Sequence, residues 1–86
     1  MFESFLKLLK EEIPFALVTI VEGPSKGAKL LVQSLDKPLE GTLGNEELDR
    51  VASRDALGEL AAGRSGVRHY GLHGEAREEA IQVFIE

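Results

Sequence analysis

Residues 15–33 decide the fold of this chain, and they read Phe15-Ala-Leu-Val-Thr-Ile-Val-Glu-Gly-Pro-Ser-Lys-Gly-Ala-Lys-Leu-Leu-Val-Gln33. The first seven residues are apolar on both alternating faces, which is typical of a central strand that is covered above and below. Residues 23–27 contain two glycines and a proline and predict a turn. Residues 28–33 alternate again, so we expect a second strand that pairs with the first as a hairpin.

Upstream of this hairpin, residues 2–13 carry apolar side chains at spacings of three and four, separated by charged ones. This pattern predicts an amphipathic helix. Its apolar positions are Phe2, Phe5, Leu6, Leu9 and Ile13. Pro14 ends the helix, because the residue before a proline is pushed out of the helical region. We expect the helix to cover one face of the sheet, with a partner-binding helix as the alternative.

Downstream, residues 35–38 predict a turn and residues 39–43 a short third strand. Asn45 is a good helix N-cap, and the acidic residues after it suit the positive end of a helix dipole. Gly63 is placed to end this second helix. Leu57 and Gly58 do not fit its apolar stripe, so we expect an irregular middle.

Residues 67–72 and 80–85 predict the last two strands, and in the second of them Ile81, Val83 and Ile85 alternate with Gln82 and Phe84. The fold class is therefore α+β. We expect one small domain over residues 1–86, with two helices and a mixed or mainly antiparallel sheet of about five strands, in the order α-β-β-β-α-β-β.

The composition excludes several classes of function. The 86 residues include no cysteine, so disulfides, thiolate metal sites and cysteine nucleophiles are absent. The formal charge of −5 and the scattered basic residues argue against nucleic-acid binding. No apolar run is long enough to span a membrane, and charged residues interrupt the N-terminus where a signal peptide would be apolar. We expect a cytoplasmic protein.

Two glycine-containing segments are candidate anion sites. The turn at residues 23–29 offers backbone amides together with Lys26 and Lys29, but it lacks the spacing of a phosphate loop. Gly41-Thr42-Leu-Gly44 precedes a helix start, where exposed amides attract anions. Glu46 and Glu47 in the same first turn would repel an anion. Structural turns are the favoured interpretation of both segments.

No catalytic set is predicted. His69 and His73 would face one metal ion on a helix, but here they fall on a strand that runs into a loop, so we expect surface histidines and no metal site. Asp49, Glu22 and Glu40 could act as acid and base only if the fold brought them together. An acid–base enzyme is therefore the weakest hypothesis.

Six segments, taken in order, carry a family resemblance. They are Ala16-Leu-Val-Thr-Ile-Val, Gly27-Ala-Lys-Leu-Leu-Val, Gly41-Thr-Leu-Gly, Leu60-Ala-Ala-Gly-Arg, Tyr70-Gly and Ile81-Gln-Val-Phe-Ile-Glu86. Together they resemble the N-terminal domain of the XdhC/CoxI family, the accessory proteins of xanthine dehydrogenase and carbon monoxide dehydrogenase. The resemblance covers almost the whole chain.

The resemblance implies an accessory function in which molybdenum cofactor is bound and delivered to a molybdoenzyme. It implies Gly41, Thr42 and Gly44 as cofactor-facing backbone, with Lys26 and Lys29 as anion contacts. Family members typically continue into a Rossmann-like domain, so we expect this chain to be a free-standing version that acts with a molybdoenzyme or a separate Rossmann-domain chain.

The departures from the family pattern concern its cysteines. Glu47 stands where the family has one cysteine, and Arg77, Glu78 and Glu79 stand where it has a cysteine and two glycines. Soft thiolate ligands for molybdenum or its sulfur are therefore missing. The first hypothesis is a non-catalytic accessory domain. The second is a protein-interaction or homodimerisation module without a cofactor site, which uses the sheet edge or the first helix.

Overall fold

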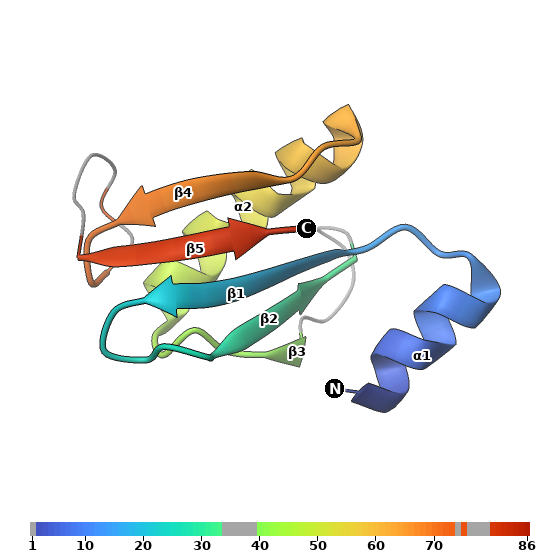
Figure 1. Ribbon diagram of the computed structural model, residues 1–86, viewed down its shortest axis with the longest axis horizontal. Helices are drawn as coiled ribbons and strands as arrows, with labels where there is room; N and C mark the ends of the chain where they lie inside the picture. Colours follow the sequence, from blue (N-terminus) through green and yellow to red (C-terminus); the bar gives the residue numbers. More distant parts are fainter. Residues whose placement is uncertain (1, 34–39, 74, 76–79) are drawn as a thin grey trace.

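In a computed structural model, which describes residues 2–33, 40–73, 75 and 80–86, the chain forms two helices and a five-stranded antiparallel sheet (Figure 1). The elements are α1 (Phe2–Glu11), β1 (Ala16–Glu22), β2 (Lys29–Val32), β3 (Glu40–Gly41), α2 (Glu46–Ala62), β4 (Gly66–Tyr70) and β5 (Ile81–Ile85). The α+β class and the element order predicted from the sequence are confirmed. The turn expected at residues 35–38 and the start of the third strand at Leu39 lie outside the described residues.

The sheet has the strand order β3-β2-β1-β5-β4, so the predicted central strand is central. β1 and β2 form the expected hairpin, with a register that runs from Ala16 opposite Val32 to Thr19 opposite Lys29. On its other side β1 pairs with β5, the last strand of the chain. A strand from each end of the sequence therefore meets in the middle of the sheet (Figure 1).

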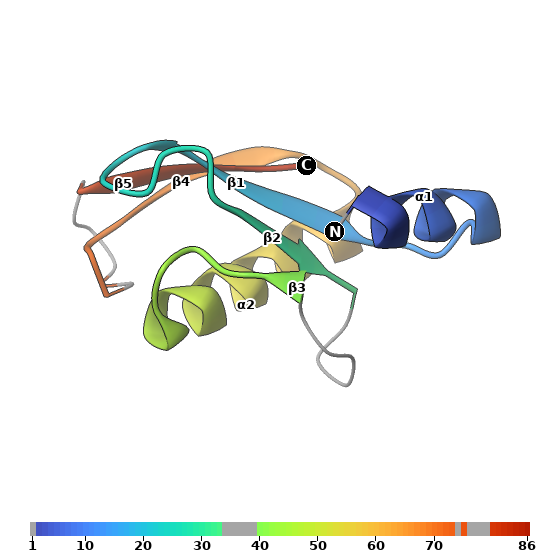
Figure 2. The same cartoon turned by 90° about the horizontal axis from the view of Figure 1, so that it is seen from below.

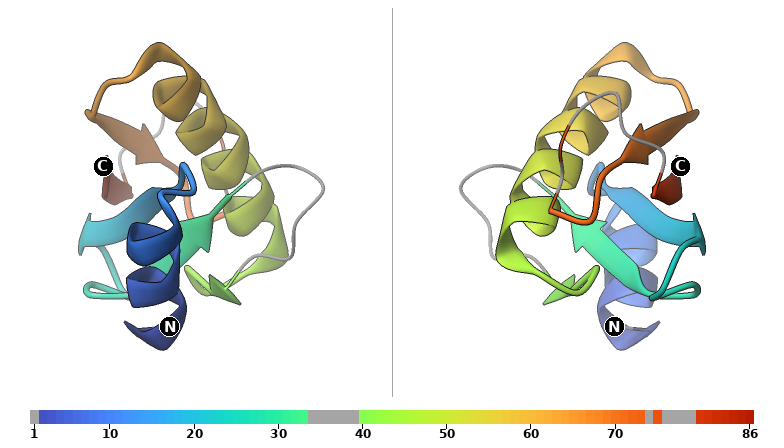
Figure 3. Two further views of the ribbon diagram at one scale, coloured as in Figure 1. Left: turned by 90° about the vertical axis from the view of Figure 1, so that its right-hand side faces the viewer. Right: turned by 90° about the vertical axis from the view of Figure 1, so that its left-hand side faces the viewer.

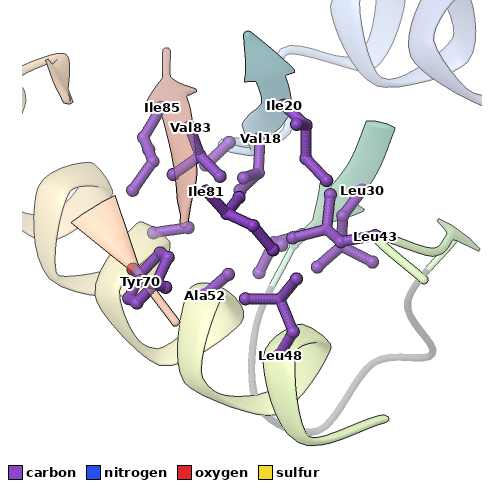
Figure 4. Packing of buried hydrophobic residues seen from close by; sticks show 13 residues of the cluster. Val18, Ile20, Leu30, Leu43, Leu48, Ala52, Tyr70, Ile81, Val83 and Ile85 are labelled. Carbon is purple, nitrogen blue, oxygen red and sulfur yellow. The ribbon is translucent and has the colours of Figure 1, made fainter. Parts of the chain in front are cut away.

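Helix α2 packs against one face of the sheet and encloses the core (Figures 2 and 4). In β1, β2 and β5 the positions that face α2 are buried, as are Leu48, Ala52 and Ala56 of the helix. The fully enclosed larger side chains are Val18, Ile20, Leu30, Val32, Leu43, Leu48, Val83 and Ile85. Burial at every second strand position follows from the two-residue period of a β-strand.

The expectation that β1 is covered on both faces is wrong. Figure 2 shows no helix over the face opposite α2 within the part of the chain that the structure describes. Leu17, Thr19 and Val21 lie on that face and remain half-buried. On this face Leu17 lies opposite Leu31, and Thr19 lies between Lys29 and Phe84 of the neighbouring strands.

Helix α1 reaches only the β2–β3 end of that face, where Leu8 lines a pocket together with Leu31 and Glu40. It lies beside the end of the sheet near β2 and β3 (Figures 1 and 3), where the Ser4 hydroxyl donates a hydrogen bond to the Glu40 carboxylate. Leu8 is buried, but Leu6, Leu9 and Ile13 are 45%, 52% and 36% exposed. The expected helix is two residues too long, because Glu12 adopts the left-handed conformation and the Ile13 N–H donates to the Leu8 carbonyl.

Both predicted ends of α2 are confirmed. The Asn45 side chain accepts a hydrogen bond from the Leu48 N–H (2.8 Å), and Gly63 adopts the left-handed conformation with φ of 68°. The irregular middle expected at Leu57 and Gly58 is wrong, since the helix is continuous from Glu46 to Ala62. Gly58 is exposed, so it interrupts the apolar pattern without breaking the helical hydrogen bonds; a glycine inside a helix costs only about 1 kcal/mol.

In the described residues, neither helix has the length and apolar character that crossing a membrane requires.

Long polar side chains join β4 to α2. Glu59 is only 4% exposed, and its carboxylate accepts hydrogen bonds from Arg68 (2.7 Å) and Arg64 (2.9 Å). The hydroxyl of buried Tyr70 donates to Asp55. Hydrogen bonds from Arg68, and then from Arg64, lower the pKa of Glu59. Among the described residues, every buried side-chain nitrogen and oxygen has a hydrogen-bond partner, so this cluster satisfies the side-chain groups that it buries.

The Glu59 cluster predicts how stability depends on pH. A lowered folded-state pKa contributes stability that is fully present above the unfolded-state pKa and is lost as the pH falls through the folded-state pKa. Urea unfolding of the wild type and of Glu59→Gln, measured from neutral pH to about pH 3, should show a stability difference that shrinks on acidification. Arg68→Gln removes the largest cause of the lowering and should flatten the acid dependence. A pH-independent difference between wild type and Glu59→Gln would contradict this assignment.

Candidate functional site

A pocket of about 370 Å³ lies at the end of the sheet where the N-terminus of α2 begins. Three connections meet there: the β1–β2 turn, the β3–α2 loop and the segment that follows β4. The lining residues are Pro24, Ser25, Leu43, Gly44, Asn45, Leu48, Leu72, His73 and Ile81. Leu43, Leu48 and Ile81 belong to the buried core (Figure 4), so the floor of the pocket is apolar and its rim is polar.

Asp49 holds the β3–α2 loop in place. Its carboxylate accepts hydrogen bonds from the Thr42 hydroxyl (2.7 Å) and from the Leu43 N–H (2.6 Å). The Gly44 N–H donates in turn to the Thr42 hydroxyl oxygen (3.1 Å). The loop that the sequence marked as an anion site therefore already directs two of its amides to a carboxylate and a hydroxyl of the protein.

Asn45 connects the other parts of the rim. Its Oδ1 caps α2, and its Nδ2 donates to the Leu72 carbonyl (2.7 Å) in the segment after β4. Gly44 has φ of 120°, and a Cβ atom at this position would lie 3.4 Å from the Ser25 hydroxyl. The β1–β2 turn, the β3–α2 loop and the segment after β4 are thus in direct contact around the pocket.

The structure brings together some of the residues predicted for the site and separates others. Gly44 lines the pocket, and Thr42 lies beside it in the same loop. Gly41 belongs to β3, opposite Leu30. Lys26 is exposed in the β1–β2 turn, next to Ser25 of the rim. Lys29 lies elsewhere: its amine donates to the Thr19 hydroxyl (3.1 Å), which lies on the sheet face away from α2.

The two histidines occupy different places. His69 is exposed on β4 opposite Gln82, whereas His73 lies at the pocket rim, where its N–H donates to the Glu75 carboxylate (3.2 Å). Within the described ranges no group of three or more metal-ligating side chains comes together.

The three carboxylates considered as an acid–base set are held in different surroundings. Asp49 holds the β3–α2 loop, and the Glu40 carboxylate accepts from Ser4 of α1. Glu22 is exposed at the end of β1. Of the family's two cysteine positions, Glu47 is exposed in the first turn of α2, and Arg77 lies outside the described residues.

Sequence reasoning missed the contributions of Ser25, Asn45 and His73 to one rim. A capping asparagine is visible in a sequence, but its second hydrogen bond to Leu72 joins residues 27 positions apart. The Glu59 cluster was missed for the same reason, although Arg64 two residues after the end of α2 is a signal that could have suggested a return contact to the helix.

The fold and the pocket together define the class, a small α+β domain with one helix packed on an antiparallel sheet and its loops gathered at one end. The XdhC and CoxI family matches residues 8–71, which are 64 of the 86 residues, so the chain belongs to this family. The resemblance predicted from the sequence is confirmed. Membership suggests an accessory role associated with molybdoenzymes. No curated protein matches the chain.

Proposed function

We propose that residues 1–86 act as one XdhC/CoxI N-terminal-like accessory domain, which is not itself catalytic and which assists the handling of molybdenum cofactor. Family membership over residues 8–71 is the observation that carries this proposal. The pocket formed by the three connections at the start of α2 is the place where we expect a ligand to contact the domain. An apolar floor with a polar rim suits a largely flat organic ligand.

The donors present around this pocket fit part of the cofactor. Lys26 supplies a positive charge for an anionic, phosphate-bearing tail. The amides of Leu43 and Gly44 are engaged by Asp49 and Thr42, and the chain has no cysteine to ligate molybdenum. The donor set therefore fits contact with the tail and does not fit ligation of the metal, so we propose a holding or presenting role in which the partner enzyme or a separate Rossmann-domain chain completes the site.

Titration with molybdopterin and with its nucleotide form tests this proposal. We expect saturable binding that Lys26→Glu weakens by about 3- to 10-fold, as a single exposed charge contact should. Lys29→Glu is the matched control, because it makes the same charge reversal on the opposite face of the sheet and should leave the affinity unchanged. No binding up to high micromolar concentration would refute the cofactor role. Equal effects of the two substitutions would refute the placement at this pocket.

A specific observation also favours the second function, a protein-interaction module. Leu6, Leu9 and Ile13 of the α1 region are exposed, and no helix among the described residues covers one face of the sheet. Exposed apolar side chains that gather on one surface mark interaction sites. If the titration fails, binding of the domain to a purified molybdoenzyme subunit, with and without Leu9→Lys, distinguishes this function from the first.

A further inference from the structure

Strand β4 forms one edge of the sheet and is the longer of the two edge strands. Its register against β5 is unbroken over all five residues, from Gly66 opposite Ile85 to Tyr70 opposite Ile81. The other edge strand, β3, has only two residues. Among the residues that the structure describes, none pairs with the outer side of β4.

The alternation of an antiparallel ladder tells which backbone groups of β4 point outward. Leu17 and Glu86 exchange two backbone hydrogen bonds (2.9 and 3.0 Å). Residues of β5 that lie an even number of positions before Glu86 therefore also direct their N–H and C=O groups toward β1. The intervening residues of β5 direct theirs toward β4, where they meet Gly66, Arg68 and Tyr70. The N–H and C=O groups of Val67 and His69 therefore face away from the sheet.

This edge carries little of the protection that isolated sheet edges usually have. Edges are commonly blunted by shortness, lysine, proline or a bulge. β4 has none of these, and Val67 is 49% exposed. Its one permanent charge, Arg68, is an inward-pointing charge of the kind that protects edges, but Glu59 neutralises it. The outward groups of Val67 and His69 thus form a template for another extended strand.

We propose that β4 pairs antiparallel with β4 of a second copy of this chain, with Val67 at the two-fold axis. In this register Val67 faces Val67 of the second copy, and each outward-pointing pair exchanges both backbone hydrogen bonds. The two five-stranded sheets join into one continuous sheet. The proposal stands independently of the cofactor role, because it uses none of the pocket residues.

The side chains of β4 match those of a second copy in this register. The carboxylate of Glu59 lies directly over Gly66, where a Cβ atom would be 3.3 Å from Oε2. With Val67 at the axis, Arg68 of the second copy lies opposite Gly66 and on the same face. Its side chain therefore lies opposite a residue that has no side chain, and the Arg68–Glu59 pair within each copy can stay intact.

The neighbouring registers lack this match. With Arg68 at the axis, the two Arg68 side chains face each other, and like charges directly opposite are destabilising. With His69 at the axis, Arg68 faces Tyr70, which is buried and already donates to Asp55. A pairing of one short strand buries a small area, so we expect a reversible dimer with a Kd of about micromolar order.

A single introduced cysteine tests the contact directly, because the chain has no other thiol. Facing residues of a hydrogen-bonded antiparallel pair have Cα atoms about 5.5 Å apart, which is within the range that a disulfide bridges. Val67→Cys should therefore form a covalent dimer on mild oxidation of a dilute sample. Glu3→Cys is the matched control, since Glu3 is an exposed residue on the polar side of α1, and it should remain monomeric. Equal cross-linking of the two variants would overturn the proposal.

Light scattering on the unmodified chain over a wide concentration range completes the test. We expect a monomer–dimer equilibrium that Val67→Lys weakens by about tenfold or more, because the substitution places two like charges opposite each other. Glu3→Lys should leave the equilibrium unchanged, and circular dichroism should show that both variants are folded. A wild type that stays monomeric at every concentration, or a Val67→Lys variant that dimerises like the wild type, would overturn the proposal.

Discussion

Replacing Leu48 with alanine should lower the free energy of unfolding by about 2–5 kcal/mol. Leu48 is fully buried in the first part of α2 and packs in the core beneath the sheet (Figure 4). The substitution removes buried apolar volume and leaves a cavity that a continuous helix and a paired sheet can fill only in part. A domain of this size has a total stability of about 5–10 kcal/mol, so the loss is a large fraction of it. Urea unfolding followed by circular dichroism measures the effect.

Two controls separate volume from position in this experiment. Leu48→Met keeps most of the volume and should cost less than about 1.5 kcal/mol. Leu72→Ala removes an exposed leucine from the rim of the same pocket and should change stability by at most about 0.5 kcal/mol. Because Leu48 also lines the pocket floor, a loss of less than about 1 kcal/mol for Leu48→Ala would mean that the floor is open to solvent, contrary to its burial.

Replacing Gly23 with alanine should destabilise the domain by about 2–3 kcal/mol. Gly23 has φ of 133°, a conformation that residues with a side chain rarely adopt. In addition, a Cβ atom would lie 3.2 Å from Cγ1 of Ile81 and 3.3 Å from the carbonyl oxygen of Ala80. The turn would have to move away from the start of β5, and with it the Pro24 and Ser25 side of the pocket.

Gly27→Ala is the matched control, because it changes the glycine at the other end of the same turn. Gly27 also has a positive φ, of 94°, but no atom lies within 4 Å of the Cβ position. This variant should therefore show only the backbone strain, about 1–2 kcal/mol. Thermal unfolding of both variants isolates the steric part at Gly23. Equal losses at the two positions would show that the contact with β5 contributes nothing.

The family assignment and the local elements could be predicted because their signals lie within short stretches of sequence. Alternation over residues 15–33 gave the central hairpin, and Asn45 and Gly63 gave both ends of α2, since a cap depends on residues three or four positions apart. The same local patterns gave wrong predictions where the result depended on which side chains are exposed to solvent. Gly58 interrupts an apolar stripe but faces solvent, and the apolar side chains of α1 remain largely exposed.

The site could be predicted only in part, because it depends on contacts between distant segments. The sequence indicated the loop from Gly41 to Gly44, but it could not show that Asp49 occupies the amide of Leu43. Lys26 and Lys29 are three residues apart and appeared equivalent. A strand directs alternate side chains to opposite faces, and this places Lys29 on the sheet face away from α2.

The sequence by itself determined the α+β class, the hairpin at the centre of the sheet, the capped helix and the family, because each of these follows from periodicity and ordered motifs along the chain. Only the tertiary structure decided which sheet face is covered, which residues meet at the pocket, and that β4 is an edge strand held to α2 by Glu59. These features depend on which distant segments pack together, and that choice is made by the burial and pairing of the whole chain.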